Sequence, residues 1–382
     1  MLRSGPLWLK PDAIFDGSHI KTGHFLKIEN ECVNQIVPKQ DMSDSEPFVE
    51  LPYMVSPGFV DLQVNGGGGI LLNDNPSAGA MLEILSVHRS FGTVAIMPTV
   101  ISDSPEIMAK AVDAAIEGKD TPGLLGLHIE GPHISVDRRG AHEKKFVRPF
   151  SESTFAFVDK LRSFDIPVII TLAPEVVSEC IIFRLSRSGA IVSLGHSNAD
   201  ASYTQAALRK GARSFTHLFN AMPPMTKREP GIVATAINSD AYTGIIGDGL
   251  HVDDEMVKLA INARPVQDRV FIVSDSMPTV GGPPMFDLYG QAIVLKNGKL
   301  VDSDGNLSGA HITMSQTVNR FISQLGIAPK EALKMAISVP ATLIDDLLVG
   351  QIHNRVITDL IVLDSEFSYL ANLDDYLKSN VC

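Results

Sequence analysis

The sequence has little cysteine and no long hydrophobic run. Its cysteines are far apart and include no Cys-x-x-Cys pair, so they predict neither a disulfide framework nor a thiolate metal site; they are Cys32, Cys180 and Cys382. No apolar run approaches the roughly 20 residues of a membrane-spanning helix. Pro6 and Pro11 interrupt the N-terminal segment before a signal-peptide core forms. We therefore expect a soluble cytoplasmic protein without a membrane partner.

Basic residues are fewer than acidic ones. The 32 lysines and arginines stand against 44 aspartates and glutamates, which gives a net charge of −12. This balance argues against nucleic acid as a partner, and an anionic substrate would need a local basic pocket. The 382 residues, 45% of them hydrophobic, suffice for a globular barrel of roughly 250 to 300 residues and one smaller domain.

Both ends of the chain have strand character. Short apolar pieces broken by glycine and polar turns occupy residues 7–37, and a polar, proline-bearing linker follows at 39–52. Strand-like sequence returns at 351–364. We predict a small β-sandwich domain from residues 1–54 and 347–382, and a barrel domain from residues 55–346.

The middle of the chain contains eight short apolar runs separated by helix-like segments. This alternation is typical of repeated βα units around a parallel sheet. Segments 78–91 and 105–119 carry apolar residues at the three- and four-residue spacing of a helix. Eight strands predict a (β/α)8 TIM barrel. The runs begin at Gly58, Thr93, Leu124, Pro167, Ala190, Ser214, Thr243 and Val270.

Reactive side chains follow these runs repeatedly. In a (β/α)8 barrel such residues lie at the C-terminal ends of the strands, where they meet in one mouth. Any one of these histidines could equally be a hydrogen-bonded structural residue, but their repetition favours a shared site. The residues are His128 and Glu130 after the third run, His196 after the fifth, His217 after the sixth, Asp248 and His251 after the seventh, and Asp275 after the eighth.

Glu130, His196 and His217 match a common ligand set for catalytic zinc, which is two histidines and one carboxylate with a position left for water. A cation held there would acidify water and polarise a carbonyl. The alternative for Glu130 is an ion pair with Arg138 or Arg139. We favour the metal, because a carboxylate at the end of an apolar strand needs a cationic partner.

Asp275 is the candidate general base for the water and general acid for the leaving group. The alternative is that it caps a following helix. His128 lies two residues before Glu130, so strand alternation directs both side chains to the barrel interior. We expect His128 to support the site by a hydrogen bond and not as a ligand.

Several motifs, occurring in order, resemble the N-acetylglucosamine-6-phosphate deacetylases of the amidohydrolase superfamily. The resemblance covers nearly the whole chain, and several ordered motifs are more specific than one. The principal motifs are PGFVDLQVNGGGG at 57–69, GLHIEGPHIS at 126–135, RGAH at 139–142, LGHSNAD at 194–200, THLFNAM at 216–222, GDGLHVD at 247–253, VSDSMP at 273–278 and LSGAHITM at 307–314.

The resemblance implies removal of the acetyl group from N-acetylglucosamine 6-phosphate. It implies the metal ligands and the general base named above, with His142 polarising the acetyl carbonyl. It also implies a homodimer in which Arg228 binds the substrate phosphate in the neighbouring active site. The implied substrate-binding residues are Ala141, Asn220, Ala221, Arg228, His251, Leu307, Ser308 and Gly309.

One departure from the wider superfamily bears on the number of metal ions. Gln63 and Asn65 stand where many members have His-x-His, and amides are poorer ligands for zinc-like ions than imidazole. We predict one divalent ion per chain, with Gln63 and Asn65 as supporting or weak second-metal residues. Zinc is the default, and iron, cobalt, manganese and nickel are the alternatives. A second departure, NRVITDL at 354–360, lies far from the chemistry.

Two other functions are compatible with these residues. One is hydrolysis of a different acetamido or cyclic-amide substrate, because barrels change specificity through their loops. The other is a non-catalytic barrel that binds a sugar phosphate.

Overall fold

The computed structural model describes residues 6–43 and 45–380. The chain forms two compact units. Among the described residues, one unit contains 6–43, 45–60, 89–95 and 314–380, and the other contains 61–88 and 96–313. The predicted boundaries at residues 54 and 347 therefore differ from these units mainly in residues 314–346, which form helices α8 (Met314–Ser323), α9 (Pro329–Ala336) and α10 (Ser338–Leu343).

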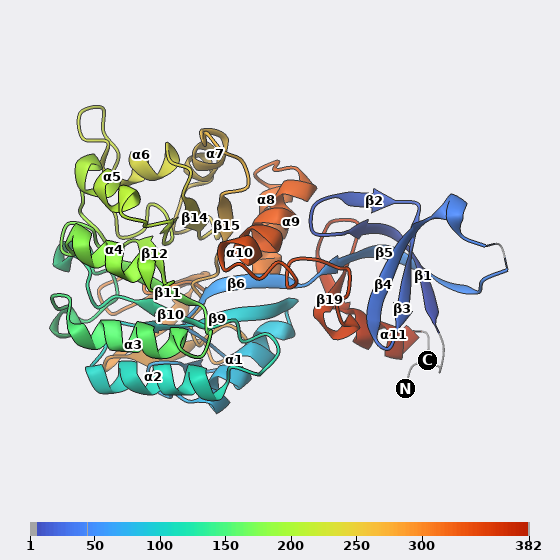
Figure 1. Cartoon of the computed structure of the whole chain (residues 1–382), viewed down its shortest axis with the longest axis horizontal. Helices are drawn as coiled ribbons and strands as arrows, with labels where there is room; N and C mark the ends of the chain where they lie inside the picture. Colours follow the sequence, from blue (N-terminus) through green and yellow to red (C-terminus); the bar gives the residue numbers. More distant parts are fainter. Residues whose placement is uncertain (1–5, 44, 381–382) are drawn as a thin grey trace. The chain divides into compact units, whose positions relative to one another are not determined.

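Eight parallel strands form the central sheet (Figure 1). They follow one another around the sheet in chain order, and each corresponds to one of the eight predicted runs, so the expected (β/α)8 barrel is confirmed. Hydrogen bonding continues from the last strand to the first, since Asp275 N–H donates to Gln63 O at 3.0 Å. The strands are β6 (Phe59–Val64), β9 (Thr93–Ile101), β10 (Leu127–Glu130), β11 (Val168–Leu172), β12 (Ile191–Leu194), β13 (Ser214–Phe215), β14 (Tyr242–Ile245) and β15 (Val270–Ile272).

The barrel strands are buried along their whole length. Such strands are covered on both faces, which explains why they appear in the sequence as continuous apolar runs and not as an alternation. Polar residues are buried within them as well, among them His128, Thr171 and Ser193. These polar positions are where the candidate site is built.

One helix follows each of the first seven barrel strands. Helix α2 illustrates the local signals: Pro105 occupies its first turn, and Ser104 Oγ accepts a hydrogen bond from Ile107 N–H, as expected at a helix start. Across residues 6–43 and 45–380, no helix combines the length and apolarity needed to cross a bilayer. The helices are α1 (Ala78–Arg89), α2 (Pro105–Glu117), α3 (Glu152–Arg162), α4 (Glu179–Arg187), α5 (Ala201–Arg209), α6 (Gly231–Ile237) and α7 (Asp254–Asn262).

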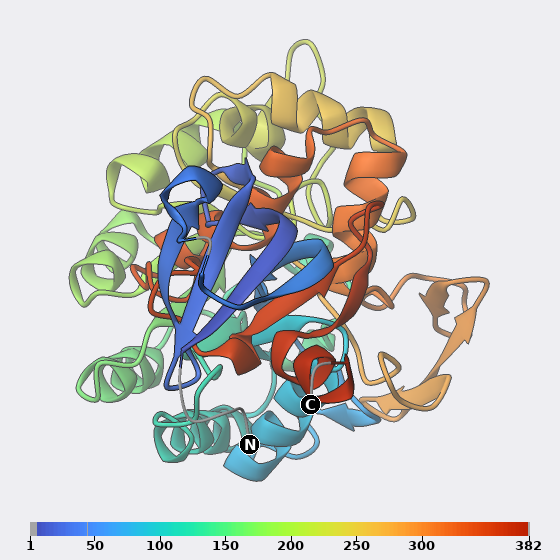
Figure 2. The ribbon, with the colours of Figure 1, turned by 90° about the vertical axis from the view of Figure 1, so that its right-hand side faces the viewer.

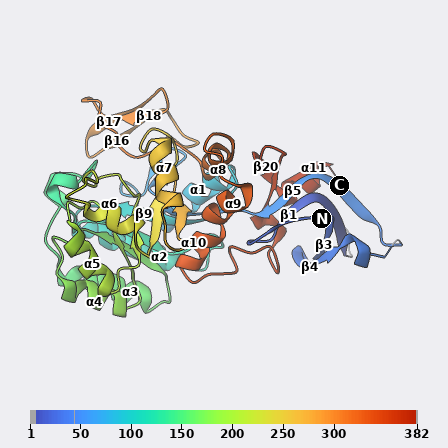
Figure 3. The same ribbon diagram turned by 90° about the horizontal axis from the view of Figure 1, so that it is seen from above.

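A small antiparallel sheet follows the last barrel strand (Figure 3). It contains β16 (Met285–Leu288), β17 (Gln291–Lys296) and β18 (Lys299–Val301). Asn297 and Gly298 connect β17 to β18 with φ of 52° and 79°, the left-handed values that a two-residue hairpin turn requires. An Asn-Gly dipeptide is the usual occupant of such a turn, and β17 and β18 pair antiparallel on either side of it.

Strands from both chain ends form a seven-stranded sheet, as Figure 2 shows by its neighbouring blue and red strands. The small domain expected from both ends is confirmed, and its strands share one hydrogen-bonded sheet. Leu9, Leu26, Val55 and Val362 belong to its core. The strands are β1 (Leu7–Phe15), β2 (Ile20–Thr22), β3 (His24–Glu29), β4 (Cys32–Pro38), β5 (Phe48–Pro57), β19 (Leu360–Leu363) and β20 (Tyr369–Asn372), and helix α11 (Leu373–Asn380) follows them.

We expect Asp359→Ala to lower the free energy of unfolding by about 3 kcal/mol, because it removes the common partner of two partly buried arginines. Asp359 is 5% exposed. Its Oδ1 lies 2.5 Å from Arg89 Nη2 and its Oδ2 lies 3.0 Å from Arg355 Nη2. Denaturant unfolding would measure the loss.

Asp113→Ala is the matched control. Asp113 pairs with Lys160 at the surface, where both side chains are more than half exposed, so its removal should cost less than about 1 kcal/mol. Equal losses in the two variants would contradict the role given to Asp359.

Candidate metal and substrate site

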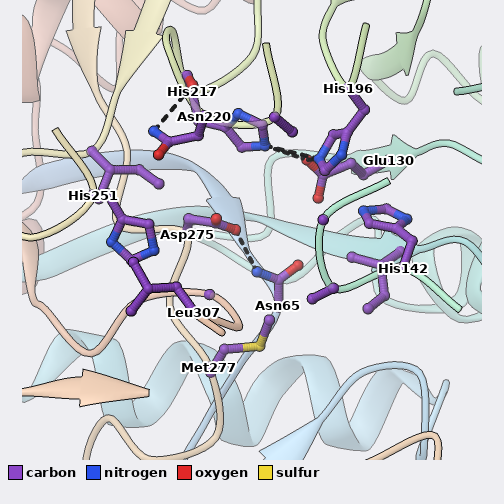
Figure 4. A pocket seen from close by; sticks show the side chains of 16 residues that line it. Asn65, Glu130, His142, His196, His217, Asn220, His251, Asp275, Met277 and Leu307 are labelled. Atoms are coloured by element: carbon purple, nitrogen blue, oxygen red, sulfur yellow. Dashed lines mark hydrogen bonds and ion pairs between the residues drawn. The ribbon is translucent and has the colours of Figure 1, made fainter. Parts of the chain in front are cut away.

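A cavity of about 190 Å³ lies where the C-terminal ends of the barrel strands meet. Figure 4 shows its polar side chains directed toward a common centre. They come from strand ends that are far apart in sequence, as the barrel predicts. Predicted site residues among its lining are Asn65, Glu130, Ala141, His142, His196, His217, Asn220, Ala221, His251, Asp275, Leu307 and Gly309.

Glu130, His196 and His217 make the tightest cluster in this cavity. Glu130 Oε1 lies 3.2 Å from His196 Nε2 and 3.1 Å from His217 Nε2, and the two nitrogens are 3.0 Å apart. All three side chains are buried. Ligands of a tetrahedral zinc ion with bonds of about 2.0–2.1 Å lie roughly 3.3 Å apart, so the three atoms have nearly the spacing that such an ion requires. The alternative pairing of Glu130 with Arg138 or Arg139 is not the one found, because Glu130 is paired with these histidines.

The hydrogen bonds of His196 suit a metal ligand. Its Nδ1 lies 3.0 Å from Arg138 O, and a carbonyl only accepts, so Nδ1 carries the proton and Nε2 presents its lone pair to the cluster. His217 Nδ1 is buried without a hydrogen-bond partner among the described residues.

Electrostatics also favours positive charge at this cluster. Burial by itself would raise the pKa of Glu130, but the hydrogen bonds with His196 and His217 outweigh burial and hold that pKa well below its usual value. Burial would lower the pKa of His217, yet the Glu130 carboxylate raises it. Two histidines and one carboxylate that attract a positive charge fit a divalent cation.

His142 competes with His217 as a third ligand on distance alone. Ligand atoms of Glu130, His142 and His196 lie within 4.8 Å of one another. However, Ser102 N–H donates to His142 Nδ1 at 3.2 Å, and Ser102 Oγ lies 2.7 Å from the same nitrogen. An N–H only donates, so Nδ1 must be the acceptor and the neutral ring carries its proton on Nε2. His142 is thus arranged to donate a hydrogen bond, and His217 is the better ligand.

Burial keeps His142 neutral. It lowers the pKa of this ring to about 3, with His196 as a further cause. A neutral imidazole with its proton on Nε2 suits an oxygen that gains negative charge during a reaction.

Asp275 lies across the cavity and accepts hydrogen bonds from two amides. Asn65 Nδ2 donates to Asp275 Oδ1 at 2.7 Å, and Gln63 Nε2 donates to the same oxygen at 3.1 Å. Burial, with Glu130 as the next cause, raises the pKa of Asp275 to about 6, which is a useful range for proton transfer near neutral pH. No helix begins after Asp275 until α8 at Met314, so the helix-cap alternative does not describe this residue.

Gln63 and Asn65 direct their amide NH2 groups at carboxylates. Gln63 Nε2 also donates to Glu130 Oε1 at 3.0 Å, which links Glu130 to Asp275. These NH2 groups hold the two carboxylates in place, and an amide could coordinate a cation only through its oxygen, which is a poorer ligand for zinc-like ions than imidazole. The geometry therefore favours the supporting role over a second metal site.

His251 and Asp248 form a pair at the end of β14. His251 Nδ1 lies 2.6 Å from Asp248 Oδ2, and Asp248 Oδ1 accepts the N–H groups of Leu250 and His251. The carboxylate fixes the proton on Nδ1 and leaves Nε2 for a ligand. Asp248 and Ser102 are site residues whose roles the sequence did not reveal, although Asp248 follows a predicted strand.

Four predicted residues do not line this cavity. His128 is buried beneath Glu130 in the barrel interior, and Gln63 lies behind the carboxylates that it contacts. Ser308 lines an adjoining cavity. Arg228 lies on an exposed loop, so within one chain it is not brought to the site.

Three central side chains depend on unusual backbone geometry. His196, His217 and Asp275 have φ of 48°, 26° and 49°. Residues with a Cβ pay about 1–2 kcal/mol for this left-handed region, and such strain is concentrated at functional sites. Neither the periodicity nor the strand-end position of these residues predicted this turn.

Residues 54–380 match the model of the Amidohydrolase family. An N-acetylgalactosamine-6-phosphate deacetylase of Shewanella sp. (strain ANA-3) is 39% identical over 82% of this chain and 80% of its own length. An N-acetylglucosamine-6-phosphate deacetylase of Haemophilus influenzae is 32% identical over 91% of this chain and 92% of its own length.

A solved structure has the same fold. The crystal structure of N-acetylglucosamine-6-phosphate deacetylase from Pasteurella multocida superposes with a TM-score of 0.89 at 32% identity. It covers 96% of this chain, and this chain covers 97% of it.

Proposed function

This chain belongs to the amidohydrolase family, and from that premise we propose that it hydrolyses the acetamido group of an N-acetylhexosamine 6-phosphate, with N-acetylglucosamine 6-phosphate as the first substrate to test. The products are acetate and glucosamine 6-phosphate. The observation that carries the proposal is the convergence of Glu130, His196 and His217 with two proton-handling groups, His142 and Asp275, around one cavity.

Glu130, His196 and His217 would hold one divalent cation, with zinc as the default. When bound, this cation polarises the substrate carbonyl and makes water more acidic. Gln63 keeps Glu130 in place through its 3.0 Å hydrogen bond. We assign no second cation, since Gln63 and Asn65 hold carboxylates through their NH2 groups and their amide oxygens are poorer ligands for zinc-like ions than imidazole.

His142 and Asp275 have different roles in the proposed reaction, since His142 stabilises negative charge and Asp275 transfers the proton. His142 Nε2–H donates a hydrogen bond to the acetyl oxygen as negative charge develops there. Asp275 accepts a proton from the attacking water and then delivers it to the nitrogen of the sugar as the C–N bond breaks. Ala221, Asn220 and His251 line the cavity and would bind the sugar.

Acetate release from N-acetylglucosamine 6-phosphate tests the proposal. We expect release that is abolished by a chelator and restored by zinc, with about one metal ion per chain. A metallated, folded protein that releases no acetate from this substrate would reject it. Release from another acetamido or cyclic-amide compound would then favour the alternative amidohydrolase, and binding without any turnover would favour the non-catalytic barrel.

A second candidate substrate is the C4 epimer. The observation that favours it is the 39% identity to a relative named N-acetylgalactosamine-6-phosphate deacetylase, which exceeds the 32% identity to the Haemophilus protein. Measuring kcat/KM for both epimers with the same preparation decides between them. The larger value identifies the preferred sugar.

We expect Arg228→Ala to reduce kcat/KM for the phosphorylated sugar about 10- to 100-fold, the loss of a charge-assisted hydrogen bond to phosphate. The same change should leave hydrolysis of unphosphorylated N-acetylglucosamine unaltered. Because Arg228 lies on an exposed loop, it would act in the active site of a second copy, which makes a homodimer part of the proposal.

Arg187→Ala is the control, because it removes another exposed arginine. Equal effects of the Arg228 change on both sugars would contradict a phosphate contact. Sedimentation of the wild-type protein as a monomer at assay concentration would contradict the shared site.

We also propose the domain bounds and the cellular location of this protein. The barrel domain would comprise residues 55–346, with the small domain formed by residues 1–54 and 347–382. A cytoplasmic location agrees with Cys32 and Cys180, which are both unpaired, as in a reducing compartment.

A further inference from the structure

A chain of buried hydroxyl groups lies in the barrel interior beneath the candidate metal ligands. His128 Nε2 lies 2.7 Å from Thr171 Oγ1, which lies 2.6 Å from Thr216 Oγ1, and Ser193 Oγ lies 2.7 Å from Thr216 Oγ1. These four side chains are 0–3% exposed. We call His128, Thr171, Thr216 and Ser193 the hydroxyl belt.

The belt connects the strands that carry the ligands. Thr171 on β11 is the register partner of Glu130 on β10, and Ser193 on β12 is the register partner of Thr171. Thr216 directly precedes His217, and Ser193 lies three residues before His196. The belt therefore lies next to each of the three ligand-bearing segments along the chain.

The direction of the hydrogen bonds in the belt is fixed at one end. His128 Nδ1 lies 3.1 Å from Leu62 O, so Nδ1 donates and Nε2 of the neutral ring accepts. Thr171 must then donate to His128, Thr216 to Thr171, and Ser193 to Thr216, because each hydroxyl has a single proton. A network with one consistent direction holds its members in one arrangement.

The hydroxyl belt is closely packed against the backbone at Gly195. A Cβ at Gly195 would lie 2.9 Å from Thr216 Cβ and 3.1 Å from Thr171 Cγ2. Gly195 directly precedes His196, which turns into the left-handed region at φ of 48°. The backbone that carries His196 is thus packed directly on two members of the belt.

We propose that the hydroxyl belt positions Glu130, His196 and His217 for the cation, and that Thr171 is its central positioning residue. The inference rests on the metal site of the proposed function and extends it to residues that touch neither cation nor substrate. Groups that orient ligands from behind commonly change metal affinity or activity by about 10- to 100-fold.

Thr171→Val tests the belt, because valine keeps the shape of threonine and removes the hydroxyl. We expect the affinity for zinc, measured by competition with a chelator, to fall about 10- to 100-fold, and the visible absorption spectrum of the cobalt-substituted protein to change. We expect kcat to fall with KM nearly unchanged, and Thr171→Ser, which restores a hydroxyl, to recover zinc affinity.

Thr93→Val is the matched control. Thr93 is also fully buried in a barrel strand, but its hydroxyl has no hydrogen-bond partner among the described residues. The zinc affinity of Thr93→Val should equal that of the wild type. If Thr171→Val does not fold, Ser193→Ala removes only the last donor of the belt, and we expect a smaller loss of zinc affinity in the same direction.

Unchanged zinc affinity in folded Thr171→Val would overturn the positioning role of the hydroxyl belt. If that variant does not fold, unchanged zinc affinity in Ser193→Ala would do the same. Failure of Thr171→Ser to recover the zinc affinity would also overturn this role. If metal-free Thr171→Val melts at a lower temperature than the wild type but binds zinc with wild-type affinity, the hydroxyl belt has a purely structural role and the proposal is overturned. A wild-type protein that binds no zinc, cobalt, iron, manganese or nickel would instead reject the metal site of the proposed function, and the belt with it.

Discussion

Asp275→Asn should reduce kcat about 10²- to 10⁴-fold, the usual contribution of a positioned acid or base. An asparagine side chain can neither accept the proton of the water nor deliver it to the leaving nitrogen. Its amide oxygen can still accept the hydrogen bonds of Asn65 and Gln63 that now reach Asp275 Oδ1. Asparagine also tolerates left-handed geometry such as the φ of 49° at this position. The fold and the bound metal should therefore persist, which metal analysis and thermal unfolding would check.

Asp253→Asn is the control for this change. Asp253 is the N-cap of α7, where its side chain accepts from Glu255 N–H, and asparagine is an equally good cap. Its kcat should match that of the wild type. Near-normal turnover in Asp275→Asn itself would exclude Asp275 as the general base.

Glu130→Gln should weaken metal binding by more than about 100-fold, because changes to outer hydrogen-bond partners alone cost about 10- to 100-fold. The substitution removes the only carboxylate of the ligand cluster and the charge that raises the pKa of His217. At low zinc concentration, the turnover of Glu130→Gln should fall to that of wild-type protein treated with a chelator. Metal content after dialysis, measured with activity on the same sample, checks both effects.

Glu255→Gln is the matched control, since Glu255 is an exposed residue that pairs with Lys258 at the surface. It should retain full metal content and activity. A Glu130→Gln protein that keeps one tightly bound metal ion would show that the cation is held elsewhere, and His142 would then have to be reconsidered as a ligand.

The sequence alone predicted the barrel and the general location of the site. Strands buried on both faces appear as continuous apolar runs, and eight of them alternating with helical segments leave few other folds. In parallel barrels the strand ends share one mouth. Glu130, His196, His217 and Asp275 could therefore be expected to meet although up to 145 residues separate them, from position 130 to position 275.

The tertiary structure decided the arrangement of protons within that site. The strand ends predicted His217 as the ligand, but the contact that gives His142 a different role comes from Ser102 N–H, a backbone donor 40 residues away from His142. The sequence left Gln63 and Asn65 as either weak ligands or supports, and only the contacts of their NH2 groups with Glu130 and Asp275 favour support.

The barrel could be predicted from the sequence and the proton positions could not, for a physical reason. Strand formation and burial depend on local periodicity and on the sum of many apolar contacts, so they are encoded redundantly along the chain. A tautomer or an amide orientation depends on one or two hydrogen bonds between segments distant in sequence. The sequence therefore determined which residues meet, and the fold determined which of them accept, donate or bind.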